Sequence, residues 1–200
     1  MADMKDQNLN KVSIQLPLGG HSFSCEDLRR AVPQLPASGV VSIVLPTHKT
    51  TLVPMEILQT TDAVSCLAAV GLMPLPSECV VCSPAVDGMV AVMAVDGECH
   101  KMLCHELGSA VRYMSPLLSL HNADKEVVLS LVKNVLYVRL YNDGLRFAEA
   151  MLLAEDADVI YMLQSLHNVY NIYNMRARIV DGESRLRALC KRLFRDVVCE

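Results

Sequence analysis

Cysteines and histidines are the residues of this chain whose spacing first points to chemistry. Cys79 and Cys82 are followed by the adjacent pairs Cys99-His100 and Cys104-His105. Thiolate and imidazole are the ligands that zinc prefers, and a Cys-x-x-Cys spacing is also typical of thioredoxin-like redox sites. The spacing therefore raises two hypotheses, a zinc site and a redox-active thiol pair.

The local sequence around these residues argues against both hypotheses. Glu78–Ser83 is rich in β-branched residues and predicts a strand, on which residues three apart point to opposite faces. Cys99 and Cys104 lie five apart on an expected helix, about 140° around its axis. The redox motif also belongs at a helix N-terminus, which this one does not occupy. We therefore expect no bound metal and cysteines that pack as small apolar side chains.

Composition limits the kind of protein that can carry these residues. The chain has 200 residues, 52% of them hydrophobic, a mean hydropathy of +0.30, eight cysteines and a net charge of −4. The longest uncharged stretches, Ala31–His48 and Ala63–Ser77, contain prolines, and the polar Met1–Lys11 is no signal peptide. The acidic balance and a 4% aromatic content argue against nucleic-acid binding. We expect a globular cytoplasmic protein without a membrane span.

The elements expected in residues 1–118 are short strands and helices separated by Gly and Pro. Thr50–Val53 leads through Pro54 into two short helices, the second capped by Thr61 or Asp62. The predicted strands are Lys11–Leu16, His21–Cys25, Val40–Leu45, Cys79–Ser83, Met89–Val95 and Ala110–Ser115, and a further helix spans Glu98–Leu107. The first two strands form a hairpin around Gly19-Gly20.

The elements expected in residues 119–200 are more regular. Three consecutive strands, Glu126–Val132, Val135–Tyr141 and Leu145–Met151, are joined by turns so short that they must be antiparallel. A helix after Glu155 buries residues at three- and four-residue steps, namely Val159, Leu163, Leu166, Tyr170 and Tyr173. A strand at Arg176–Val180, a helix at Ser184–Arg195 and a last strand at Val197–Cys199 follow. This is the order of a ribonuclease-H-like unit.

The first half begins in the same way, with a hairpin and then a third strand, which indicates an internal duplication. We therefore predict an α/β protein of two tandem ribonuclease-H-like halves, residues 1–118 and 119–200, with mixed sheets flanked by helices.

The chain resembles the actin-like ATPase superfamily in this plan, and within it an uncharacterised bacterial family, a domain of unknown function. The resemblance rests on Val12–Ser24, on Thr51–Pro54 leading into a helix, and on Leu145–Tyr161. It implies an actin-like fold for nearly the whole chain and says almost nothing of function.

The resemblance also implies where a nucleotide would bind. Superfamily members hold ATP and Mg²⁺ with two Asp-x-Gly hairpin turns, and a strand, a Gly-Gly turn and a helix border the adenosine. In this chain the first turn, at Gly19-Gly20, has glycines but no Asp, and the second turn, at Lys133-Asn134, has neither. The third turn, around Gly182, carries Asp181 and Glu183 in place of small residues. The matching residues are Gly19, Gly20, Lys133, Asn134, Gly182, Ser184 and Arg185.

Phosphoryl transfer needs metal ligands that these turns lack. We therefore expect no catalytic residues and no cofactor, and a non-catalytic protein that acts by binding a partner protein. The alternative is a nucleotide-binding protein or weak ATPase that takes ATP and Mg²⁺ into the cleft between the halves. The glycines also have a plainer explanation, since Gly19-Gly20 and Asp181-Gly182 can simply be turns.

Overall fold

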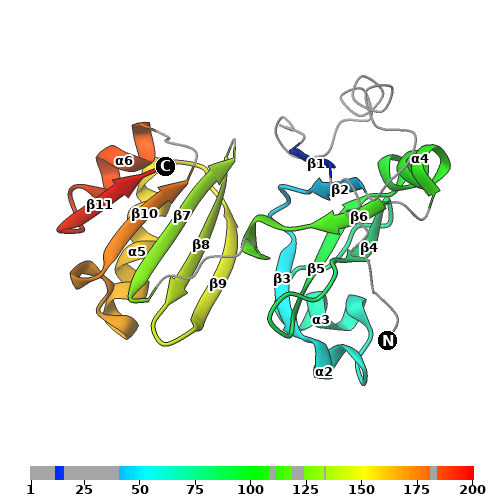
Figure 1. Cartoon of the computed structure of the whole chain (residues 1–200), viewed down its shortest axis with the longest axis horizontal. Coiled ribbons are helices and arrows are strands. Elements are labelled where there is room, and N and C mark those ends of the chain that lie inside the picture. The colour runs from blue at the N-terminus through cyan, green and yellow to red at the C-terminus, as the bar shows by residue number, and fades with distance from the viewer. Residues whose placement is uncertain (1–11, 16–40, 109–110, 119–123, 133, 181–183) are drawn as a thin grey trace, which may run out of the picture.

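The computed structural model describes residues 12–15, 41–108, 111–118, 124–132, 134–180 and 184–200. These residues form a mixed α/β structure of three sheets with helices packed against them (Figure 1). The strands are β1 Val12–Gln15, β2 Val41–Val44, β3 Thr50–Pro54, β4 Glu78–Cys82, β5 Met89–Asp96, β6 Val111–Met114, β7 Glu126–Val132, β8 Val135–Tyr141, β9 Leu145–Leu152, β10 Arg176–Val180 and β11 Asp196–Cys199. The helices are α2 Met55–Leu58, α3 Ala63–Ala69, α4 Gly97–Leu107, α5 Asp156–Tyr170 and α6 Ser184–Cys190, with 3₁₀ turns η3 Pro116–Leu118 and η4 Ile172–Asn174.

The antiparallel sheet β3-β5-β4 is covered on both faces, because its central strand β5 is apolar from Met89 to Val95. Val92 and Ala94 point to one face, where they pack against Leu67 of α3. Ala91, Met93 and Val95 alternate with them and contact a second cluster, which includes Cys99 and Leu103 of α4 and Tyr113 of β6. The strand pattern therefore buries β5 between α3 on one face and α4 with β6 on the other.

The small sheet β1-β2-β6 is parallel, a direction that the sequence pattern leaves open. β2 pairs in parallel with β1, Val12 opposite Val41, and β6 pairs in parallel with β2. The strand predicted at Val40–Leu45 is confirmed, as β2. Hydrophobic alternation fixes which side chains are buried but not strand direction. His21–Cys25, the expected partner in the hairpin, lies outside the described residues.

The second part of the chain is one five-stranded sheet in the order β11-β10-β7-β8-β9. β7, β8 and β9 form the predicted antiparallel meander, and β10 and β11 add in parallel to the other side of β7. Both α5 and α6 lie on one face of this sheet (Figure 1).

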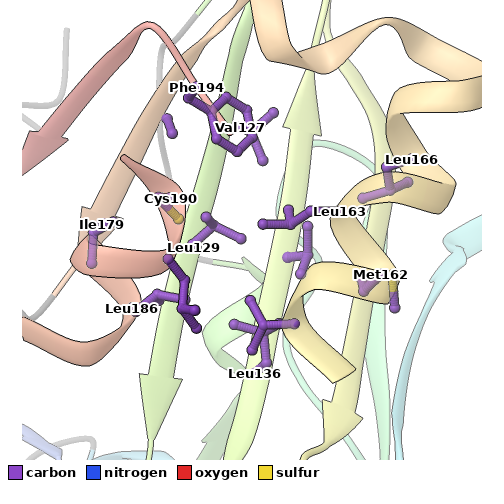
Figure 2. Close-up of a cluster of buried hydrophobic side chains, with 14 of the residues drawn as sticks. Val127, Leu129, Leu136, Met162, Leu163, Leu166, Ile179, Leu186, Cys190 and Phe194 are labelled. Atoms are coloured by element: carbon purple, nitrogen blue, oxygen red, sulfur yellow. The ribbon is translucent and has the colours of Figure 1, made fainter. Parts of the chain in front are cut away.

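The main core of the chain lies between that sheet and its two helices (Figure 2). Leu129 of β7 and Leu136 of β8 meet Leu163 of α5, and each of the three is fully buried. The expected face of α5 is confirmed for Val159, Leu163 and Leu166. α6 ends at Cys190 rather than Arg195, because the chain then turns to bury Phe194 in the same core before β11 begins.

Helix starts follow the capping rules that the sequence indicates. Asp62 caps α3 by accepting a hydrogen bond from the backbone N–H of Ser65, and Asp96 caps α4 in the same way. Gly108 ends α4 with a φ of 55°. In the described part of the chain, no helix is long and apolar enough to cross a membrane.

Candidate functional site

The residues predicted to hold a nucleotide are only partly described by the structure. Gly19, Gly20, Lys133 and Gly182 lie outside the described residues. Asn134, Ser184 and Arg185 lie inside them. Because β7 and β10 are parallel neighbours, Asn134 after β7 and Ser184 after β10 lie at the same edge of the sheet.

Two of these residues already have partners within the protein. The carbonyl oxygen of Asn134 accepts a 2.7 Å hydrogen bond from the backbone N–H of Leu153. Arg185 of α6 donates from Nε to Asp156 in the first turn of α5, and both side chains are about half exposed. The guanidinium is therefore engaged with a carboxylate rather than held open for a phosphate.

The opposite edge of the sheet carries an ion network that sequence reasoning missed. β7, β10 and β11 start in register, so Glu126, Arg176 and Asp196 lie side by side. Arg178 Nε lies 3.1 Å from both carboxylate oxygens of Glu126, and its Nη1 donates to Glu200. These hydrogen bonds raise the pKa of Arg178 above its ordinary value, and the bond to Glu126 has the largest effect.

A polar surface cavity of about 450 Å³ lies over this ion network. Its lining carries charges of both signs: Lys125, Arg176, Arg178 and Arg195 against Asp124, Glu126 and Asp196. Arg176 is bound at 2.8 Å to Asp196, as Arg178 is to Glu126. These pairs reduce the attraction that Arg176 and Arg178 would otherwise exert on an anionic ligand.

A second cluster joins β4, α4 and β6. Cys99 is buried while the adjacent His100 is not, as expected for neighbours on a helix. His100 and Cys104, however, lie one turn apart on the same face of α4, with Sγ 3.6 Å from Nε2. His100 Nδ1 lies 2.7 Å from the hydroxyl of Tyr113 on β6. The four-residue spacing in the sequence is the signal that could have found this contact.

Burial shifts the ionisation of two groups in this cluster. Tyr113 is 8% exposed, and burial raises the pKa of its hydroxyl, with the nearby Cys104 as a smaller cause. Burial also raises the pKa of the Cys79 thiol, and the charge of Cys104 adds to that effect. Among the described residues, no group of three or more His, Cys, Asp or Glu side chains is arranged to hold a metal ion.

An exposed apolar segment spans residues 55–75, over α2, α3 and the loop that follows. In the described part of the chain, ten large apolar side chains are exposed, and six of them belong to this segment: Met55, Ile57, Val64, Val70, Met73 and Leu75. The segment carries two acidic residues, Glu56 and Asp62, and no Lys or Arg. We call residues 55–75 the apolar segment below.

Comparison with known proteins shows the fold. No known protein family matches the chain, and no curated protein matches it in sequence. A crystal structure from Bacteroides thetaiotaomicron, of a protein with actin-like ATPase fold and unknown function, superposes with a TM-score of 0.73 at 14% identity. The match covers 88% of this chain and 76% of that one. The chain therefore has an actin-like ATPase fold.

A second solved structure is more distant. It is the cytoplasmic domain of EpsL, an inner membrane component of the type II secretion system of Vibrio cholerae. It matches with a TM-score of 0.43 at 12% identity, over 80% of this chain and 67% of that one.

Proposed function

We propose that the chain is a non-catalytic cytoplasmic protein that binds a partner protein through the apolar segment. We further propose that it belongs to the uncharacterised bacterial family that it resembles, with ribonuclease-H-like halves at residues 1–118 and 119–200. The strand order of the second sheet, three antiparallel strands followed by two parallel to the first, supports that division for the second half.

The observation that carries partner binding is the exposure of the apolar segment. Met73 and Leu75 are 62% and 56% exposed, and Met55 and Ile57 of α2 are nearly as accessible. α3 already buries Leu67 against β5, so these other side chains do not complete the core. Monomeric proteins rarely expose large contiguous apolar patches, and we propose that the exposed side chains of the apolar segment form such a patch.

The charge of the segment indicates the chemistry of the partner. Glu56 and Asp62 are exposed, and no basic residue accompanies them between Pro54 and Ser77. A protein surface with an apolar centre and Lys or Arg at its rim would match both properties. The occupant that we propose is such a protein rather than a second copy of this chain.

The experiment first captures the partner and then measures its affinity. A photo-reactive amino acid replaces Ile57 in cells of the source organism, and the same replacement at the exposed Gln164 on α5 serves as the control. We expect one protein to crosslink at Ile57 and not at Gln164. The captured protein is then purified, and its Kd is measured with the wild-type chain and with Met73→Glu/Leu75→Glu.

Two buried carboxylates in an apolar interface should weaken binding at least about tenfold, an energy of about 1.4 kcal/mol. The matched control is Tyr161→Glu/Val169→Glu, which changes two side chains of α5 that are 74% and 72% exposed. It should leave the Kd unchanged. Equal affinity of the wild type and the Met73/Leu75 variant, or a crosslink to a second copy of the chain, would refute the proposal.

Nucleotide binding is a second candidate function. Its support is the parallel pairing of β7 and β10, from which Asn134 and Ser184 follow at one edge, as in the superfamily arrangement. The turns lack the carboxylates that hold Mg²⁺, so we propose at most binding of ATP without fast hydrolysis. A thermal shift with ATP and Mg²⁺ separates this function from the first, because partner binding alone predicts no stabilisation by nucleotide.

A further inference from the structure

We propose that Cys104 is a modification site, a thiol that exchanges with low-molecular-weight disulfides such as glutathione disulfide, with His100 as its proton acceptor. The site consists of Cys104 and His100 on α4 and Tyr113 on β6. It is separate from the apolar segment and from the edge of the five-stranded sheet where Asn134 and Ser184 lie.

The geometry brings an accessible sulfur to a ring nitrogen. Cys104 is exposed, and its Sγ lies 3.6 Å from Nε2 and 3.9 Å from Nδ1 of His100. The ring of His100 is also fixed, because Tyr113 contacts it both by hydrogen bond and by a tilted ring contact at 5.6 Å. A thiol beside a positioned imidazole is the arrangement in which cysteine is reactive.

Tyr113 holds Nδ1 of His100 and is compatible with the tautomer that this chemistry needs. Burial raises the pKa of Tyr113, so its hydroxyl stays protonated at neutral pH. When His100 Nδ1–H donates to the Tyr113 oxygen, Nε2 carries no proton and can accept one, and the Cys104 sulfur lies beside the same ring at nearly equal distances from both nitrogens. Cys104 also raises the pKa of the Tyr113 hydroxyl, a smaller effect than that of burial.

The exchange balances without any further reagent. His100 Nε2 takes the proton of the Cys104 thiol, and the thiolate attacks one sulfur of the disulfide. The new bond joins Cys104 to that sulfur, the original S–S bond breaks, and the second sulfur leaves as a thiolate that accepts the proton from His100. Excess thiol reverses the step by the same route.

A second exposed thiol in the same molecule serves as an internal reference. Cys82 on β4 is exposed like Cys104. Partial burial of its thiol nevertheless raises the pKa, and the neighbouring Cys66 adds to the effect. Cys82 should therefore exchange slowly. Exchange at Cys82 would be slow even if Cys104 were an ordinary thiol. The deciding comparison is therefore the exchange rate at Cys104 in the wild type and in a variant without His100.

The test follows glutathione disulfide adducts on the reduced full-length chain at pH 7, quenched by alkylation and located by peptide mass mapping. An unperturbed thiol is only ~3% thiolate at pH 7, which limits any gain in rate to ~30-fold. We expect His100→Gln to slow exchange at Cys104 at least fivefold while exchange at Cys82 stays unchanged. Tyr113→Phe should also slow exchange at Cys104.

The matched control is His105→Gln, on the neighbouring residue of the same helix. His105 contacts Glu106 and its side chain is 84% exposed, so its loss should leave exchange at Cys104 unchanged. The unchanged rate at Cys82 in every variant shows that the fold is intact. If His100→Gln leaves the rate at Cys104 unchanged, or if His105→Gln slows it equally, the proposal is wrong.

Discussion

The hydroxyl of Tyr137 donates a 3.2 Å hydrogen bond to the carbonyl oxygen of Thr47, and so joins β8 to the turn before β3. Tyr137 is 1% exposed and lies in a small apolar cluster with Leu117, Val135 and Ala150, against which Leu52 of β3 packs. Burial raises the pKa of Tyr137, so the hydroxyl remains a donor at neutral pH. The contact ties the five-stranded sheet to the first part of the chain.

Removing that hydroxyl tests how much the contact stabilises the fold. Tyr137→Phe keeps the apolar packing and leaves the Thr47 carbonyl without this donor, so we expect a loss of about 1 kcal/mol in the free energy of unfolding. Urea denaturation measures the change. Tyr161→Phe, at a side chain that is 74% exposed, is the control and should change nothing. Equal stability of both variants would contradict a structural role for the bond.

The two arginines of β10 should differ in their effect on stability. Glu126, which Arg178 binds, is 2% exposed, whereas Arg176 and Asp196 are both more than half exposed. Breaking a buried ion pair is costly, while an exposed pair contributes ~0–1 kcal/mol. We expect Arg178→Met to destabilise the chain by about 2 kcal/mol more than Arg176→Met. Chemical denaturation of the two variants checks this, and an equal loss would argue against a buried role for Glu126.

Asp158 should make the stability of α5 dependent on pH. Its carboxylate accepts hydrogen bonds from the backbone N–H groups of Glu155 and Ala154, and these bonds lower its pKa below the ordinary value of 3.8. A lowered pKa in the folded state contributes stability above pH 3.8, which is lost as the pH falls through the folded value. Asp158→Asn should therefore lower the Tm at pH 7.

The difference in Tm between wild type and Asp158→Asn should shrink as the pH falls below 3.8. Asp87→Asn is a matched control, because Asp87 is an exposed turn residue with a φ of 50°, a conformation that Asn also adopts. Thermal melts over this pH range measure both variants. A difference that stays constant with pH would exclude the charged cap as its cause.

The order of strands and helices from Glu126 onward could be predicted from the sequence, although α6 ends earlier than expected. β7 and β8 begin and end where the sequence places them, because turns as short as Asn142–Gly144 leave only an antiparallel arrangement. In the first half, the parallel direction of β1 and β2 could not be predicted, since alternation carries no information on strand direction. Residues far apart in sequence, such as Tyr137 and Thr47, meet only in the fold.

The candidate sites were predictable to different degrees. Most of the apolar segment is visible in the sequence as the uncharged stretch Ala63–Ser77, but its exposure is not visible, because the same residues could have formed a core. Arg178 and Glu126 are separated by 52 residues and pair only through strand register. His100 and Cys104 are separated by four residues on a predicted helix, so their contact was within reach of the sequence.

The central claim is that this actin-like fold acts without nucleotide chemistry. Its most direct test is to measure the Tm of the purified chain as ATP and Mg²⁺ are titrated in. The proposed function predicts no saturable rise in Tm at any concentration of ATP or ADP. A saturable stabilisation of several degrees that Gly182→Arg abolishes would contradict the claim and favour a nucleotide-binding protein.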